Sequence, residues 1–323
     1  MGIRSLSLAM AGALSLAAAP LLPAQDFPSR PIRVIVPFPP GGAMDSVVRL
    51  VSQEMAQGLN HPVIVENKPG AGTVIGVAAA ARSAPDGYTL VVIATSFAAN
   101  YTLVRDLPYD SLKDFRPIAL LTTAPHVLVG KPDLAARDLR ELVALAKARP
   151  GKLSYASPGN GTGQHLGMET LKAAEGLDIV HIPYKGEDQA LKDMLAGQVD
   201  LMVGNLPTAL PHIRSGKLTV FGVGSRERSQ LAPDIPTIRE QGIEGFESTS
   251  WFGLVAPAGV PDAIVQRLNR EVVRTLSLPE VKKALIARGF EPSPTSPEEL
   301  QAIILAQIDR SARAIRTAKI HID

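Results

Sequence analysis

The chain has 323 residues, of which 46% are hydrophobic and 20% charged, so it is long enough for two domains with cores of their own. It contains no cysteine, which excludes disulfides, thiolate metal sites and a lipid-modified N-terminal cysteine. The formal net charge is only +2, which gives no electrostatic case for binding nucleic acid or a membrane surface.

Residues 1–24 have the pattern of a secretory signal peptide. Arg4 supplies a positive charge, residues 5–22 are almost wholly Leu, Ala, Gly, Ser and Met, and Pro23-Ala24-Gln25 offers a small-residue processing site. Cleavage after Ala24 is our first choice, and the alanines at 17–19 offer an alternative site. A transmembrane anchor is the competing interpretation, but the apolar segment is short and rich in alanine. We therefore expect a soluble periplasmic protein that is not a lipoprotein.

The next part of the chain alternates strands with helices. The predicted elements are a strand at 28–38, a helix from the Gly41-Gly42 turn to residue 59, a strand at 61–67, a helix at 74–82 and a strand at 88–96. Residues 97–115 are predicted to form a loop, and residues 116–133 a long extended segment. This alternation predicts α/β order with a parallel sheet.

A second alternation follows a helix predicted at 139–148. It comprises strands at 153–156, 178–184, 198–205 and 218–225 and helices that end at 174, 196 and 214. A long β-branched and aromatic segment at 246–259 is predicted to carry the chain back to the first domain. Two amphipathic helices, 263–276 and 297–318, are expected to close the chain.

Two glycine-rich turns between a predicted strand and a helix are the features best suited to ligand binding. Gly41 and Gly42 precede the first helix, and Gly159, Gly161 and Gly163 precede the helix that ends at residue 174. Helix N-termini leave N–H groups without intrahelical partners and attract anions. One such turn is compatible with no binding at all, but two copies favour two walls of one cleft.

The predicted fold is α/β with two lobes, each a mostly parallel sheet flanked by helices. Two crossing strands, near 118–130 and 247–256, are expected to form a hinge. Lobe 1 is assigned to residues 25–121 plus 250–323 and lobe 2 to residues 122–249. Ligands of open parallel sheets bind beyond the carboxyl ends of the strands, which places the site between the lobes.

Motifs for catalysis are missing from the sequence. It lacks G-x-S-x-G, H-E-x-x-H, a complete Walker loop and G-x-G-x-x-G, and the six histidines show no metal spacing. Ser157 and His165 are compatible with a nucleophile pair, but a ligand contact or a helix cap is the favoured interpretation. Asp188 and Asp193 are expected on a solvated helix face. We therefore predict no catalytic residue, no metal and no cofactor.

Several segments together resemble one known family. FPSRPIRVIVPFPPGGAMD, VENKPGAGTVIG, APDGYTL, LPYD, YASPGNGTGQHL, HIPYKG, NLPTALPHI, SGKL and TSWFGLVAPAG are similar to segments of the solute-binding receptors of tripartite tricarboxylate transporters, the Bug or TctC family. The resemblance runs from about residue 27 to the last helix. It implies a periplasmic binding protein with a two-lobed, type II-like hinged fold that captures small carboxylates and delivers them to a membrane permease.

In such receptors backbone N–H groups, ordered waters and small polar side chains at the lobe interface hold the ligand carboxylate. That arrangement suits a buried carboxylate, which is costly unless it is hydrogen-bonded. The ligand-binding residues that the resemblance implies here are Phe38, Gly41, Gly42, Ala43, Asp45, Thr95, Ser96, Ser157, Gly161, Thr162, His165, Tyr184 and Asn205.

Two positions depart from the family pattern. Many relatives have Thr before the acidic residue of the first loop, where this chain has Met44, and Asp often precedes the Asn of NLP, where it has Gly204. Met44 either lines a less polar pocket or points into the lobe core. Asn205 either contacts ligand or only caps the next helix. Tyr184 is compatible with a mere wall of the cleft, and Trp251 is expected to pack in the core.

The leading hypothesis is a carboxylate-binding transport receptor that works as a monomer with a permease. The sequence does not separate dicarboxylates, tricarboxylates, acidic amino acids and aromatic acids. A ligand-dependent periplasmic sensor is the first alternative, and a hydrolase that uses Ser157 and His165 is the second. In each of them the cleft is expected to close by a hinge motion.

Overall fold

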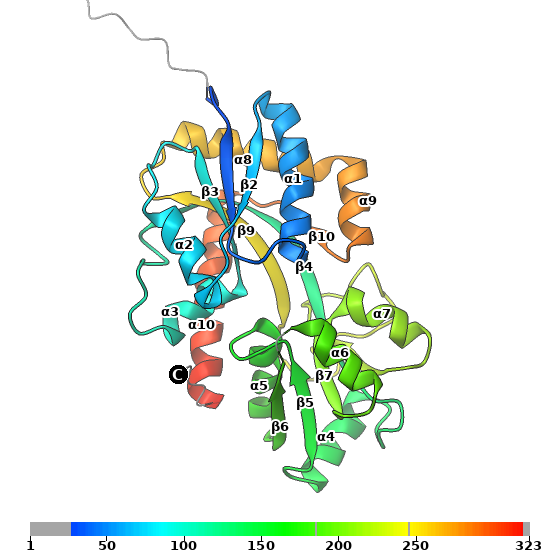
Figure 1. Ribbon diagram of the computed structural model, residues 1–323. Helices are drawn as coiled ribbons and strands as arrows, with labels where there is room; N and C mark the ends of the chain where they lie inside the picture. The colour runs from blue at the N-terminus through cyan, green and yellow to red at the C-terminus, as the bar shows by residue number, and fades with distance from the viewer. Residues whose placement is uncertain (1–26, 185, 245, 319–323) are drawn as a thin grey trace, which may run out of the picture.

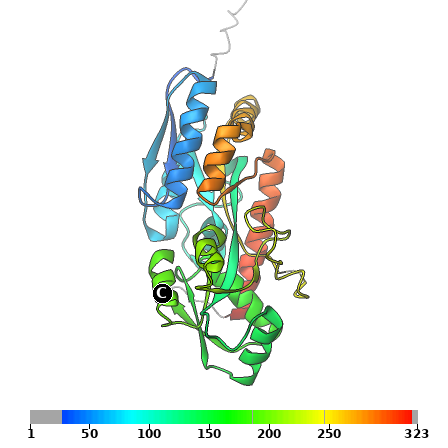
Figure 2. The same ribbon diagram turned by 90° about the vertical axis from the view of Figure 1, so that its right-hand side faces the viewer.

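The computed structural model describes residues 27–318 except 185 and 245, and in it the chain forms two α/β lobes joined by two long strands (Figure 1). Figure 2 shows the same two lobes one above the other from the side. This confirms the predicted two-lobed α/β fold. The predicted signal peptide lies outside the described residues.

Lobe 1 is built on a parallel sheet in the order β2-β1-β3, with β9 added antiparallel beside β3. Its strands are β1 (Ile32–Val36), β2 (Val63–Asn67), β3 (Thr89–Ala94) and the two-residue β10 (Glu291–Pro292). Its helices are α1 (Ala43–Leu59), η1 (Ala71–Thr73), α2 (Val74–Ala81), α3 (Thr95–Leu103), α8 (Asp262–Ser277), α9 (Pro279–Ala287) and α10 (Pro297–Ala318).

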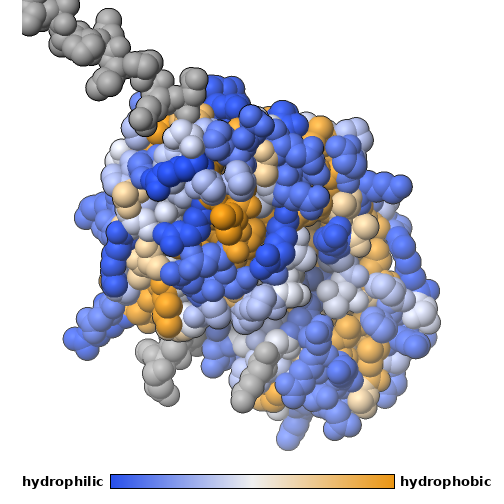
Figure 3. All heavy atoms as spheres, turned by 45° about the horizontal axis from the view of Figure 1, so that its top comes forward, coloured by the Kyte–Doolittle hydropathy of each residue, from blue (hydrophilic) through white to orange (hydrophobic). Residues whose placement is uncertain are grey.

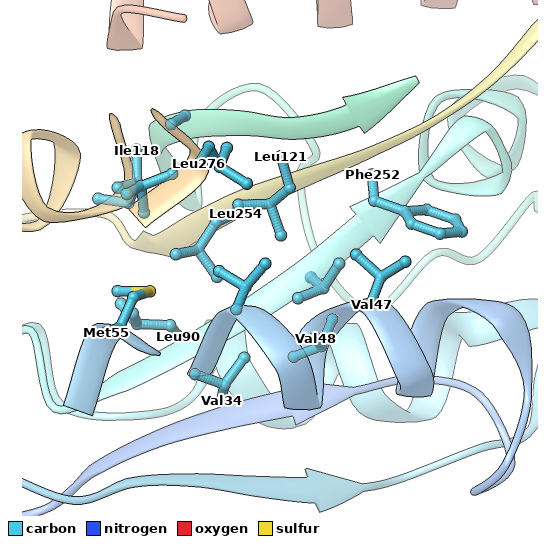
Figure 4. Close-up of a cluster of buried hydrophobic side chains, with 14 of the residues drawn as sticks. Val34, Val47, Val48, Met55, Leu90, Ile118, Leu121, Phe252, Leu254 and Leu276 are labelled. Atoms are coloured by element: carbon cyan, nitrogen blue, oxygen red, sulfur yellow. The ribbon is translucent and has the colours of Figure 1, made fainter. Parts of the chain in front are cut away.

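The larger core of lobe 1 lies between the sheet and helices α1 and α8. Val47, Val48 and Met55 of α1 recur at helical spacing, are almost fully buried, and face Leu90 and Leu254 of the sheet (Figure 4). A second cluster on the opposite face involves α2 and α10. Because β1 is buried on both faces, it reads as a continuous apolar run and holds the turn that follows it firmly.

Lobe 2 repeats the arrangement with β6 next to β5 and β5 next to β7, all parallel. Its strands are β5 (Leu153–Ser157), β6 (Ile179–Pro183), β7 (Leu201–Asn205) and β8 (Thr219–Val223). Its helices are α4 (Leu139–Ala148), α5 (Gly163–Glu175), α6 (Glu187–Leu195) and α7 (Leu206–Arg214). Helices α5, α6 and α7 therefore all begin at the carboxyl ends of strands, facing lobe 1.

The crossing strands are β4 (Phe115–Gly130) and β9 (Thr249–Pro257), which pair antiparallel with each other. Beyond Pro125, β4 leaves β9 and pairs with β7 and β8 of lobe 2, so one sheet continues through both lobes. The division of the lobes near 121 and 250 stays a proposal, and this change of partner favours a hinge at Pro125 and His126.

Helix α10 also reaches both lobes. It starts behind lobe 1 and runs toward α5 of lobe 2 (Figure 1). Ala314 and Ile315 near its end form a small apolar cluster with Ala99 of α3 and Leu166 of α5. The lobes are thus in contact through side chains on one edge as well as through the strands.

Two expectations about helices were wrong. Residues 95–103, predicted to end a strand and begin a loop, form α3, because Phe97 is buried among the rings of Tyr109 and Phe115 and the helix needs that packing rather than a strong local signal. The chain closes with three helices rather than two, since α9 starts with a proline at its first position and follows α8 after Leu278.

The surface in Figure 3 is largely hydrophilic, with apolar residues in separate small patches. In the described part of the chain, none of the helices combines the length and the apolar character needed to cross a membrane.

Candidate functional site

The first glycine-rich turn is held in place by Asp45. Its Oδ2 accepts hydrogen bonds from the Gly41 N–H at 2.9 Å and from Arg49 Nε at 2.9 Å, while its Oδ1 accepts from Asn67 Nδ2 at 2.8 Å. The same Asn67 amide also donates to the Phe38 carbonyl at 3.1 Å. Asp45 is 3% exposed, so its carboxylate ties both ends of the turn to β2 from inside the lobe.

The charge of Asp45 is stabilised by these contacts. Hydrogen bonding from Arg49, with smaller contributions from Gly41 and Asn67, outweighs burial and lowers the pKa of Asp45 to about 2. Gly42 is the N-cap of α1 and supplies no side-chain cap. The backbone of residues 41–43 therefore lies at a helix start. The hydrogen bonds of Asp45 support this turn, and a direct contact between Asp45 and a ligand stays a prediction.

Helix α3 begins at the interface with Thr95 and Ser96. Thr95 is 7% exposed, and its Oγ1 has no hydrogen-bond partner among the residues that the structure describes. Ser96 Oγ lies 3.4 Å from Thr73 Oγ1, and Asn100 donates to the Gly72 carbonyl at 2.8 Å, which ties α3 to η1. A buried hydroxyl without a partner is costly in a folded protein.

The second glycine-rich turn leads into α5. Thr162 is the N-cap, and its Oγ1 accepts from the His165 N–H at 3.3 Å and donates to the Gly159 carbonyl at 2.8 Å. The Gly161 N–H donates to His165 Nδ1 at 3.0 Å. Gly161 has a φ of +74°, which a larger residue adopts only with strain. The turn is thus shaped by its own polar groups at the start of a helix.

The proposed nucleophile pair is not formed. Ser157 Oγ lies 2.7 Å from Nε2 of His181, not from His165, and the serine is fully buried. His181 stacks between Tyr155 and His165, at 4.7 and 4.1 Å between ring centroids. Burial, with the neighbouring His165, lowers the pKa of His181 to about 3, so the ring is neutral. This stack packs lobe 2, and Ser157 has no exposed position from which to attack a substrate.

Asn205 lies at the N-cap of α7 without capping it by its side chain. Its backbone N–H donates to Glu187 Oε1 at 2.6 Å, and its Nδ2 forms a short hydrogen bond to Oε2 of the same carboxylate. Asn205 Oδ1 accepts from Gln164 at 3.5 Å and from Ser250 at 3.4 Å. Asn205 therefore links α6, α5 and β9 at the centre of the face that lobe 2 turns toward lobe 1.

Glu187 was missed from the sequence, where it follows the HIPYKG segment and belongs to none of the motifs that were singled out. Its signal is the departure at Gly204: a Cβ on Gly204 would lie only 3.0 Å from Glu187 Oε1. The carboxyl of α6 thus lies where a side chain at 204 would begin. Because β6 and β7 are not neighbours, the sequence pattern alone gave no sign that their two ends share this space.

Three further residues, Tyr184, Met44 and Trp251, are held by hydrogen bonds or packing within a lobe. Tyr184 OH donates to Asp193 Oδ2 at 2.8 Å, so Tyr184 is held within lobe 2 and Asp193 is not merely solvated. Met44 is 3% exposed and packs in the core of lobe 1, so of the two interpretations the one in which it points into the core is correct. Trp251 is likewise 3% exposed, as expected for core packing.

The two halves of the site meet where α3 faces α5. A Cβ added to Gly163 would lie 3.5 Å from Thr95 Cγ2 and 3.0 Å from His126 Cε1. His126 joins Ser248 and Ser250 of the returning chain, at 2.7 Å to each hydroxyl, and burial lowers its pKa to about 3. The N-termini of α3 and α5, from different lobes, thus lie close together beside the neutral ring of His126, both of whose nitrogens are hydrogen-bonded.

Comparison with known proteins identifies the family to which this two-lobed chain belongs. The family model described as "Tripartite tricarboxylate transporter family receptor" matches residues 47–320. The chain belongs to this receptor family. The family is one of solute-binding receptors, and its structurally characterised neighbours are periplasmic binding proteins.

Individual relatives of the receptor cover nearly the whole chain. BugT of Bordetella pertussis is 38% identical over 295 residues, which is 91% of this chain and 90% of BugT. An R. palustris protein solved with adipate is 31% identical with a TM-score of 0.79, covering 92% of this chain and 99% of that one. MatC of Rhodopseudomonas palustris, solved with bound malate, is 34% identical with a TM-score of 0.75, covering 90% and 100%.

Within the described residues of the receptor, no group of three or more acidic, His or Cys side chains is arranged to hold a metal ion. Where α3 meets α5, the groups that converge between the lobes are instead backbone N–H groups, hydroxyls and amides. This donor set suits an anion or a polar small molecule.

Proposed function

We propose that this receptor captures a small carboxylate between its lobes and delivers it to the membrane permease of a tripartite tricarboxylate transporter. The candidate ligands are di- or tricarboxylates, acidic amino acids and aromatic acids. The receptor works in the periplasm, as a monomer and without a cofactor. It binds through the turn at Phe38 to Ala43, the start of α3, the turn before α5, and Asn205.

The observation that carries this proposal is Thr95 at the junction of the lobes. Its hydroxyl is buried beside Gly163, the first residue of α5, and lacks a partner in the described part of the chain. A ligand carboxylate there would accept from the hydroxyl and from helix N–H groups, bonds that are stronger to an ionised acceptor. The adipate and malate found with two relatives support a carboxylate as ligand.

A thermal denaturation screen tests the proposal. Protein lacking residues 1–24 is unfolded and refolded to remove bound ligand and is then heated with acids or with analogues in which every carboxylate is an amide. An acid present at 100 times its Kd should add about 2.7 kcal/mol, which raises Tm by roughly 5 °C. Thr95→Val should weaken binding of that acid about 10-fold without lowering the Tm of the free protein.

Thr122→Val is the matched control. Thr122 is fully buried on β4 and, within the described residues, its hydroxyl also lacks a partner. Both variants exchange a buried hydroxyl without a partner for a methyl group, so both should leave the free protein at least as stable as before, and only Thr95→Val should lose affinity. Equal shifts with acids and amides, or no shift with any acid, would refute the carboxylate proposal.

A further inference from the structure

Glu187 lines a cavity between the lobes. None of the segments that resemble the receptor family includes this residue. The cavity has a volume of about 450 Å³. Lobe 2 contributes the start of α6, Asn205 and the start of α7, and lobe 1 contributes residues 288–290 and Ala124 of the crossing strand. Asn205 accepts a hydrogen bond from Gln164, the residue after Gly163, so this cavity lies close to the proposed carboxylate site.

The orientation of Glu187 is fixed. Each of its carboxylate oxygens receives a hydrogen bond from Asn205, one from the backbone N–H and one from the side-chain amide. The other end of that amide is directed to Gln164 and Ser250. The donors of Asn205 are consequently used by Glu187, so this pair of side chains offers the cleft acceptor oxygens rather than donors.

The charge of Glu187 is balanced between opposing influences. Burial raises its pKa to about 7, and Asp188 beside it acts in the same direction, whereas the two Asn205 donors favour the ionised form. Arg288 lines the same cavity from lobe 1, and one of its guanidinium nitrogens, Nη1, donates to the Ala284 carbonyl of α9. A ligand carboxylate brought close to ionised Glu187 would be repelled by the like charge. A ligand ammonium or amide would instead donate hydrogen bonds to the Glu187 oxygens.

Resting on the proposed function, we infer that Glu187 selects ligands that carry one carboxylate for the helix starts and a hydrogen-bond donor, an ammonium or an amide, at the opposite end. Glu187 is thus a specificity-determining residue. A plain dicarboxylate of the same length is disfavoured because its second carboxylate meets a fixed acceptor.

The test is calorimetric titration of refolded protein with acids matched in length. Succinate is compared with succinamate and γ-aminobutanoate, and adipate with ε-aminohexanoate. At about pH 8, one unit above the pKa of Glu187, the donor-terminated acids should bind about 10-fold or more tightly than the matching diacids. Lowering the pH through 7 should narrow this ratio, since protonated Glu187 no longer repels a carboxylate.

Glu187→Gln should bring the ratio to about one or below and remove its pH dependence. Glu227→Gln, the same exchange at an exposed residue of lobe 2 outside this cavity, should leave the preference in place. Preference of the native protein for diacids, or a preference unchanged by Glu187→Gln, would overturn this inference while leaving the carboxylate receptor intact. Binding of none of these acids, nor of any acid in the thermal screen, would refute the proposed function itself.

Discussion

Replacing Gly289 with alanine is expected to hold the two lobes apart and to weaken ligand binding about 100-fold or more. Gly289 follows α9 of lobe 1 and lies against Pro207 at the start of α7 in lobe 2. A Cβ at Gly289 would lie 1.9 Å from the Pro207 Cβ, and its φ is +83°. Because Pro207 is held in α7 and Gly289 follows α9, we expect the lobes to move apart to relieve this clash. Titration of ligand and small-angle scattering of the free protein measure the two effects.

Gly216→Ala is the matched control. Gly216 follows α7 as Gly289 follows α9, has a φ of +70°, and an added Cβ would have no heavy atom within 4 Å. Both variants therefore have the cost of a positive φ for alanine, roughly 1 kcal/mol in stability. Only Gly289→Ala should lose affinity and increase the radius of gyration. If Gly289→Ala binds as tightly as the native protein, the Gly289–Pro207 contact plays no part in ligand binding.

Asp45→Asn should both destabilise lobe 1 and loosen the first glycine-rich turn. The variant loses the charge that holds Arg49 and the Gly41 N–H, and a pKa lowered from 3.8 to about 2 corresponds to roughly 2 kcal/mol at neutral pH. Because the folded-state pKa is depressed, this contribution is present above about pH 4 and is lost as the pH falls toward 2. Chemical denaturation of both proteins as a function of pH should show their difference shrinking over that interval.

Asp309→Asn is the control for this prediction. Asp309 and Arg313 of α10 repeat the spacing of Asp45 and Arg49 and form an ion pair, but their side chains are 59% and 61% exposed. An exposed pair of this kind contributes about 0.5 kcal/mol or less. A loss of stability from Asp309→Asn as large as that from Asp45→Asn would show that the buried position of Asp45 is not what matters.

The parts of this fold that the sequence predicted are those with local signals. Helix α4, with Asp138 as its cap and Pro150-Gly151 beyond its end, and helix α10 were predicted with the bounds that the structure shows. The two glycine-rich turns were also located, because the switch from a buried strand to an amphipathic helix is visible in the residue pattern. Each of these signals lies within one segment.

The parts that were missed depend on contacts between distant segments. Helix α3 forms against the rings of Tyr109 and Phe115, and Ser157 pairs with His181 because β5 and β6 are neighbours. Glu187 reaches Asn205 across the end of β5, a contact that no spacing along the chain reveals. Side-chain partners at the ends of parallel strands follow from strand order, which local patterns do not determine.

The apolar contact of α10 with α5 makes the molecule's mechanics asymmetric. We expect strands β4 and β9 to act as the hinge, and the cluster of Ala99, Leu166, Ala314 and Ile315 to restrain the lobes on one edge. On the opposite edge, Gly289 of lobe 1 lies close to Pro207 of lobe 2. We therefore expect the lobes to open by a rotation that separates α7 from α9 more than it separates α5 from α10. Paired spin labels on α7 and α9 should separate more than a pair on α5 and α10, and equal separations would contradict a one-sided motion.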